Sequence, residues 1–275
     1  MTPVFLDITI LGSGTSTGIP VVGCECPVCH SDDPRNRRTR CSALISFAGH
    51  NVLIDSSTDL RQQSLREDIR RIDAVLYTHC HADHVHGIDD LRGFNLRSCK
   101  AIPIYGQERT LKRISLLFDY IFNDEMRHGY VPILDPCPVD GSFDLFGLTF
   151  EPIPLLHGDL EVLGYRCGPV AYLTDCSAIP DSSMPLLQDL QLLIIDGLRF
   201  KPHPTHFNIP QATDVAKQIG AKRTLLTHLS HDVEHGQHGQ ELPEGIEFAY
   251  DGQRITLPLE LELSTEQNVL RSGQS

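Results

Sequence analysis

Four closely spaced residues, His79, His81, Asp83 and His84, carry the clearest chemical signal in the chain. They follow the apolar run 72–78, which is predicted to be a buried strand, so they stand at a strand tip or in the loop behind it. On a helix His79 and His81 would point to different sides, whereas in extended chain they point the same way. Three imidazoles and a carboxylate at one strand tip are suitable ligands for divalent metal ions. The spacing therefore predicts two adjacent metal sites, each with only part of its ligands in this segment.

A second group of potential ligands comes earlier, where Cys24, Cys26 and Cys29 form a CxCxxC pattern. Thiolates favour zinc in tetrahedral geometry, and a short loop can fold around the ion. The three cysteines therefore predict three corners of a zinc site in an inserted loop, residues 24–30. His30 is adjacent, but the fourth ligand could equally come from far away in the sequence.

Three further residues, His157, Asp175 and His228, each stand at the end of a predicted apolar strand. Reactive residues collect at such positions because the scaffold fixes them while the loop exposes them. They are the candidates for the ligands that the first group lacks. If His228 faces that group, then His231, three residues later, is free to close the cysteine site.

The pattern of apolar runs predicts a layered arrangement of strands and helices. One amphipathic helix is expected over 58–72, with Thr58 as its cap and Leu60, Leu65 and Ile69 as its apolar stripe. The absence of a repeat or linker predicts one domain of two similar halves over residues 1–263, followed by a polar tail over 264–275. The segment 119–132 has no clear pattern. The other predicted elements are strands at 4–12, 42–47, 51–55, 72–78, 101–106 and 190–198, helices at 107–118 and 209–220, strand pairs within 143–158 and 161–175, and a last strand from 223.

The charge balance bounds the partners that this protein can have. The chain of 275 residues has 23 Lys and Arg against 36 Asp and Glu, a net charge of −13. Binding along a nucleic-acid backbone needs clustered basic contacts to phosphates, so no long nucleic acid is expected. A small anion remains compatible, because bound metal ions supply local positive charge. The one basic run, 35–40, is expected to be a solvated loop or to lean over an anion site.

The location and redox state follow from what the sequence lacks. No apolar stretch approaches the ~20 residues that cross a bilayer, and the N-terminal stretch has neither a basic region nor a cleavage site. Nine cysteines without a secretion signal are expected to be reduced thiols or metal ligands. We therefore expect a cytoplasmic protein that does not contact membranes. A homodimer is compatible with the sequence but is not predicted by it.

The HxHxDH pattern of residues 79–84 resembles the signature of the metallo-β-lactamase superfamily. The resemblance implies an α/β fold, the four-layer αββα sandwich, with a dinuclear metal site at one edge of two facing sheets. The superfamily also supplies a His, a bridging Asp and a final His, in the order in which His157, Asp175 and His228 occur. The implied ligands are His79, His81 and His157 on one ion, Asp83, His84 and His228 on the other, and Asp175 between them.

Over nearly the whole chain, CxCxxC together with the HxxH of 228–231 resembles the PhnP-type cyclic phosphodiesterases, which are related to the tRNA 3′-processing enzymes. The implied structural zinc is bound by Cys24, Cys26, Cys29 and His231. That branch has a His before the last ligand that contacts the scissile phosphate, and His206 matches it, with His203 as the weaker candidate. Asp83 is a second candidate for handling protons. Cys80 and Cys176 flank predicted ligands and have no predicted role.

The predicted function is hydrolysis of a small cyclic phosphate or nucleotide diester. Two divalent ions, zinc or manganese, ~3.5–4 Å apart can hold a bridging hydroxide and stabilise displacement at phosphorus. A tRNA 3′-processing endonuclease is the alternative enzyme, disfavoured by the net charge, the cysteine cluster and the lack of a Gly/Pro-rich arm. A non-catalytic metal- or nucleotide-binding protein, similar to PqqB-type relatives, is the alternative of another class.

Overall fold

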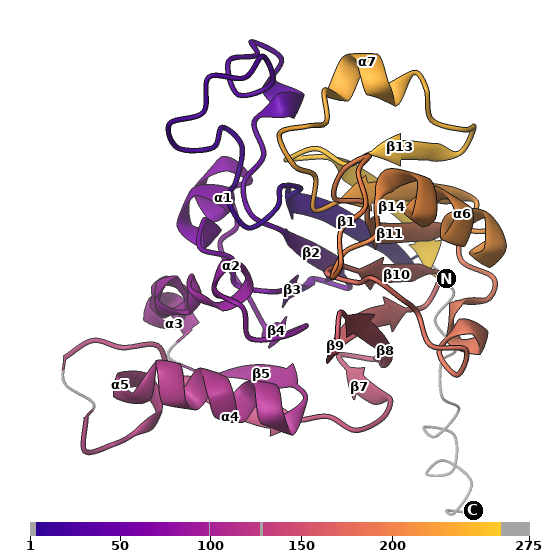
Figure 1. Ribbon diagram of the computed structural model, residues 1–275. Coiled ribbons are helices and arrows are strands. Elements are labelled where there is room, and N and C mark those ends of the chain that lie inside the picture. Colours follow the sequence, from indigo (N-terminus) through magenta and orange to yellow (C-terminus); the bar gives the residue numbers. More distant parts are fainter. Residues whose placement is uncertain (1–3, 99, 127–128, 260–275) are drawn as a thin grey trace, which may run out of the picture.

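The computed structural model describes residues 4–98, 100–126 and 129–259, which form two facing seven-stranded sheets with helices outside (Figure 1). The first sheet has the order β14-β1-β2-β3-β4-β5-β6. Its strands are β1 (Val4–Gly12), β2 (Ser42–Phe47), β3 (His50–Ile54), β4 (Ala74–Leu76), β5 (Ile102–Gly106), β6 (Leu134–Pro138) and β14 (Arg254–Leu259).

The second sheet has the order β13-β12-β11-β10-β9-β8-β7. Strands β10, β11 and β12 run parallel to one another, so their carboxyl ends lie at the same edge. The strands are β7 (Phe143–Leu145), β8 (Leu148–His157), β9 (Leu160–Cys167), β10 (Val170–Leu173), β11 (Leu192–Asp196), β12 (Arg223–Thr227) and β13 (Ile246–Phe248). The predicted four-layer αββα fold in a single domain is confirmed.

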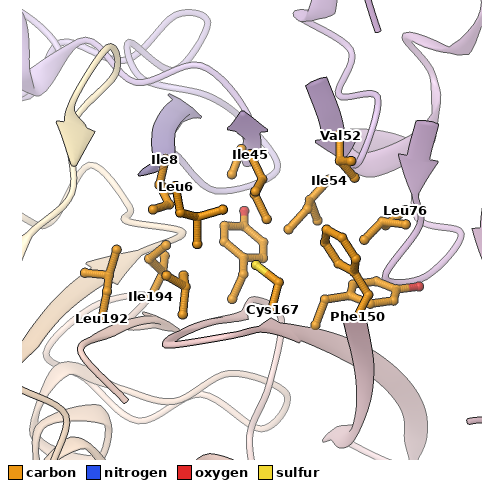
Figure 2. Close-up of a cluster of buried hydrophobic side chains, with 14 of the residues drawn as sticks. Leu6, Ile8, Ile45, Val52, Ile54, Leu76, Phe150, Cys167, Leu192 and Ile194 are labelled. Carbon is orange, nitrogen blue, oxygen red and sulfur yellow. The ribbon is translucent and has the colours of Figure 1, made fainter. Parts of the chain in front are cut away.

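The central strands are buried on both faces, which explains their continuous apolar runs. In β11, Leu192 and Ile194 enter the core between the sheets, while Leu193 and Ile195 enter the core on the other side. Figure 2 shows Leu192 and Ile194 among the side chains of the core between the sheets. Each such side chain contributes about 1.5–3 kcal/mol when fully buried. Polar ligands are therefore tolerated at the strand ends and not along their length.

Helices cover the outer faces of both sheets (Figure 1). The second sheet is covered by α6, which starts with a capping box between Asn208 and Gln211 and ends at Gly220 with φ +74°. A left-handed residue ends a helix easily when it is glycine. The helices are α1 (Leu60–Arg66), α2 (Ala82–Val85), α3 (Arg92–Ser98), α4 (Glu108–Leu117), α5 (Asp119–Phe122), α6 (Ile209–Ile219) and α7 (His235–Gly239), with single 3-10 turns at Pro34–Asn36, Ile88–Leu91 and Met184–Leu187.

The helix predicted over 58–72 is wrong in its extent and its cap. It covers only Leu60–Arg66, and Asp68 at φ +53° turns the chain away shortly after its end. The Thr58 hydroxyl bonds to the Ala82 carbonyl and does not cap the helix. Leu65, expected in the apolar stripe, is 67% exposed.

Three other predicted segments differ from the structure or lie outside it. The strand predicted over 72–78 is shorter, Ala74–Leu76, and the predicted tail over 264–275 lies outside the described residues. In the unassigned segment, α5 begins at Asp119, and the Tyr120 hydroxyl donates to Asp89 in the turn after the HxHxDH motif. Of the helices described, none has the length and apolarity to cross a membrane.

Candidate active site with two metal centres

The ends of four strands bring the predicted ligands to one edge of the sandwich. His79 and His81 follow β4, and Asp83 and His84 lie on the short helix α2 directly behind them. In the second sheet β8 ends at His157, Asp175 follows β10, and His228 follows β12. The topology therefore collects in space the seven residues that the sequence separates by up to 149 positions, from 79 to 228.

The seven side chains form the two groups that the sequence predicts. The ligand atoms of His79, His81, His157 and Asp175 lie within 4.8 Å of one another, and those of Asp83, His84, Asp175 and His228 do the same. Asp175 belongs to both groups. Its Oδ2 is 3.8 Å from His79 Nε2, and its Oδ1 is 3.1 Å from His84 Nε2 and 3.4 Å from His228 Nε2.

The donor set fits two divalent cations. The Nε2 atoms of His79, His84 and His228 are buried and have no hydrogen-bond partner among the described residues. A buried polar atom without a partner is costly, so such atoms are rare unless a ligand satisfies them. Here they converge on the carboxylates of Asp83 and Asp175, and imidazole with carboxylate is the donor set that zinc, manganese and iron accept.

An outer layer of hydrogen bonds fixes the orientation of these imidazoles. His84 Nδ1 donates to Asp55 at 2.7 Å, and Asp55 in turn accepts bonds from the amide and hydroxyl of Thr78. His79 Nδ1 lies 3.0 Å from the Thr78 hydroxyl, and His157 Nδ1 donates to the Thr205 carbonyl at 2.7 Å. With Nδ1 bonded outward, each Nε2 faces the metal centre.

Charges within the site favour cations. Burial lowers the pKa of His228, but Asp175 and Asp83 outweigh it and raise that pKa to about 9. Burial also lowers the pKa of His84, but the nearby carboxylates outweigh it and raise that pKa well above its usual value. Burial raises the pKa of Asp175, but the surrounding imidazoles outweigh it and hold that pKa well below its usual range. Protons and metal ions therefore compete for the same imidazoles.

Three residues of this edge adopt a backbone conformation that side chains other than glycine rarely take. Asp55, Asp175 and His228 have φ of +59°, +52° and +59°. Such a conformation costs about 1–3 kcal/mol and persists only where the surroundings determine it. All three are buried strand-end residues, so the strain is confined to the site and its supports.

His206, the residue predicted to contact substrate, lies next to one ligand of each group and is 9% exposed. Its ring centroid is 4.6 Å from those of His157 and His228. Its Nδ1 donates to Asp196 at 2.7 Å, and Asp196 also accepts the amide of Cys176. Asp196 was not predicted, although it ends an apolar strand as the ligands do. The weaker candidate is His203, whose ring centroid lies 5.0 Å from that of His206.

The cysteine group is completed by the residue that the sequence predicts. His231 Nδ1 lies 3.2, 3.6 and 3.7 Å from the sulfurs of Cys24, Cys26 and Cys29. Four donors at these separations can share one tetrahedral zinc. His30 is exposed and outside this group.

Two flanking cysteines have no ligand role. Cys80 packs against the core of the first sheet, and Cys176 is fully buried in the core of the second. The Gly-rich loop after β1 contacts the segment behind His228 through its backbone: the Thr15 amide donates to the Leu229 carbonyl, and the Leu229 amide donates to the Ser13 carbonyl.

Comparisons with known proteins show the family of this chain. A family model described as a β-lactamase superfamily domain matches residues 50–229. A crystal structure of a diphosphatase from the PhnP family is 42% identical, with a TM-score of 0.88, over 93% of this chain and 99% of that one.

Curated relatives extend the comparison. An octanoyltransferase from Porphyromonas gingivalis is 44% identical over 248 residues, which are 88% of this chain but only 50% of that protein, so the chain spans about half of that relative's length. A ribonuclease Z from Bradyrhizobium diazoefficiens is 29% identical over 137 residues, 48% of this chain and 45% of that protein. With the buried His and Asp clusters, these matches place the chain among enzymes: it belongs to the metallo-β-lactamase superfamily and, within it, to the PhnP family of metal-dependent hydrolases.

Proposed function

We propose that this hydrolase cleaves a small phosphate diester, a cyclic phosphate or a nucleotide diester. The observation that carries the proposal is the pair of His and Asp groups joined by Asp175, with His206 directly beside them. Two divalent ions bound there, zinc or manganese, supply a nucleophile at neutral pH and neutralise charge on the phosphate.

The residues of the chain supply orientation and proton transfer. Because His206 Nδ1 is held by Asp196, its Nε2 is the ring nitrogen left to face substrate. An imidazolium at that position donates a hydrogen bond to a phosphoryl oxygen or a proton to the leaving oxygen. Asp196 fixes the orientation of the ring. Asp83 is a ligand of the second group, and its carboxylate lies 3.2 Å from His84 Nε2 and 3.7 Å from His228 Nε2.

A diphosphate linkage is the second candidate substrate. It is favoured by the diphosphatase of the PhnP family that is 42% identical over nearly its whole length. Cleavage of a diphosphate and of a diester are both displacements at phosphorus, so the same ligands and His206 serve either reaction. A tRNA precursor is disfavoured by the net charge of −13.

We propose a cytoplasmic protein, supported by cysteines that are all unpaired among the described residues and by a thiolate group of the kind that oxidation would destroy.

The test is a substrate panel with manganese- and zinc-loaded protein: 2′,3′-cyclic nucleotides, an aryl phosphodiester, a dinucleoside diphosphate and a tRNA precursor. We expect turnover of the small diesters and an intact precursor, with Asp83→Ala as the inactive control. Turnover of the diphosphate alone would replace the diester with the second candidate. Cleavage of the precursor would overturn the charge argument, and no turnover of any of the four would overturn the proposed reaction class.

A further inference from the structure

The basic run 35–40 is only partly a solvated loop, because one of its basic side chains enters the protein. Arg35 pairs with Asp33 and Arg40 with Asp59 at the surface, while Arg38 is 1% exposed. Burial lowers the pKa of Arg38 to about 10, which leaves it charged at neutral pH. A buried cation is costly unless its donors are all satisfied.

The acceptors around Arg38 are carbonyl oxygens, and two of them belong to the last active-site loop. Nη1 donates to the Ser230 carbonyl at 3.0 Å, and Nη2 donates to the Val233 carbonyl at 2.8 Å. Nη2 also donates to the Asn36 side-chain carbonyl at 3.0 Å, and Nε donates to the Arg35 carbonyl at 3.2 Å. The guanidinium fork therefore grips residues 230–233 at both ends.

Asn36 extends this grip along the same loop. Its side-chain carbonyl accepts the His235 amide at 2.8 Å, and its amide nitrogen donates to Glu234 at 2.7 Å. Asn36 is fully buried, so these bonds are shielded from water. Arg38 and Asn36 together hold the stretch 230–235 that follows the catalytic edge.

That loop has to satisfy two sites at once. His228 faces the dinuclear group and His231 faces the cysteines, with Ser230 between them. His228 is also in the left-handed conformation at φ +59°, which needs strong constraints from its surroundings. Gly14 makes room for the constraint, because a Cβ there would lie 2.8 Å from the Arg38 carbonyl oxygen and 2.9 Å from its Cβ.

We propose that Arg38 is a positioning residue that couples the two metal centres. It fixes the loop so that His228 reaches one centre while His231 reaches the other, although it touches neither set of ligands. When its fork is lost, the loop relaxes, His228 leaves its strained conformation, and His231 holds the cysteine zinc less firmly. The proposal rests on the assignment as a metal-dependent hydrolase and not on which phosphate ester is the substrate.

The test compares Arg38→Lys with Arg37→Lys, its exposed neighbour in the same run. Lysine keeps the charge but lacks the planar fork that reaches two carbonyls in fixed geometry. We expect Arg38→Lys to lower kcat about 10-fold or more with KM little changed, as loss of an outer support of a metal ligand does. We also expect faster zinc transfer to a coloured chelator, measured without substrate, and an altered thiolate absorption band in cobalt-substituted protein. Arg37→Lys should match the parent protein in all three.

A second variant keeps the test sharp if folding suffers. Arg38→Ala should be restored in part, in both kcat and zinc retention, by added methylguanidinium, while lysine-like amines should not restore it. Equal kcat and equal zinc release for Arg38→Lys and Arg37→Lys would overturn the proposal. So would a kcat loss that only follows the loss of folded protein and does not respond to methylguanidinium. Because zinc release needs no substrate, a wrong choice of phosphate ester would leave this result intact.

Discussion

The two candidate metal sites of this protein differ in how much support they receive from strands and helices. The His and Asp ligands stand at the ends of strands or on α2, and, His81 apart, they are buried, at no more than 8% exposure. The cysteines lie in a loop without helix or strand, and Cys24 and Cys26 are half-buried. Only Ile19, Val28 and Cys29 are buried in the small apolar cluster around them.

This difference separates what each site is for. The two sheets and the bonds from Asp55, Thr78 and Thr205 hold the dinuclear ligands in place before any ion binds, which is the preorganisation that catalysis needs. The cysteine loop has only a small apolar core around it, so a zinc ion bound there would contribute directly to folding. The sheets therefore keep the His and Asp ligands rigid, whereas the cysteine loop would depend on its metal ion for a fixed shape.

The largest effect should follow a change in the reactive site itself. Asp83→Ala removes a carboxylate 3.2 Å from His84 Nε2 and 3.7 Å from His228 Nε2. We expect turnover of small phosphodiesters to fall by about 10²–10⁴-fold, with the circular-dichroism spectrum unchanged. Metal analysis should show loss from the dinuclear site with the cysteine zinc retained. Parent-like turnover would exclude Asp83 from the site's chemistry.

A smaller effect, without loss of metal, is expected at His206. It lies beside the ligands without belonging to either dinuclear group, so His206→Ala should lower kcat by about 10²-fold while metal content stays constant. His203→Ala is the matched control, because His203 lies one ring further out and should change kcat only a few-fold. Equal losses in the two variants would assign no special role to His206.

The opposite signature is expected at the cysteine site. Cys26→Ser should release one zinc and lower the melting temperature, by about 2–4 °C for each kcal/mol of stability lost. It should reduce turnover less than Asp83→Ala or His206→Ala does. The Cys26 sulfur is 3.6 Å from His231 Nδ1, so serine removes one corner of the site. If zinc content and melting temperature were both unchanged, the structural assignment would be wrong.

The same contrast explains how far the sequence could predict this structure. β1 and β2 begin and end where predicted, because each is a mostly apolar segment followed by a glycine-containing turn. The candidate ligands of the dinuclear site can be predicted because they are ligand types at the end of such a segment or shortly after it. Asp55 and Asp196 carry the same signal after β3 and at the end of β11, so it could have found them too.

The wrong predictions concern features that are decided by tertiary contacts, which a local sequence pattern does not contain. The stripe of 58–72 includes Leu65, which faces solvent, because the helix stops after Arg66 and only part of the stripe meets the sheet. Arg38 stands in a run of polar residues, and its burial is decided by carbonyls almost 200 positions away, at 230 and 233. The sequence therefore predicts the candidate ligands better than it predicts the buried residues that support them, such as Arg38.

The smallest effect concerns acid stability near the cysteine site. Burial, with help from Arg35 and Arg38, lowers the pKa of His235 from its ordinary 6.5 to about 4. The folded state therefore binds fewer protons than the unfolded state between these values, so its stability is complete above pH 6.5 and falls as the pH drops toward 4. At about 1.4 kcal/mol per pKa unit, the shift from 6.5 to about 4 contributes at most about 3.5 kcal/mol. His235→Phe cannot take up a proton, so its free energy of unfolding, measured with urea at pH 7 and pH 4.5, should fall less than that of the parent protein. His50→Phe, far from both sites, is the control and should follow the parent; parallel losses in all three proteins would mean that the cysteine and carboxylate groups alone set the acid limit.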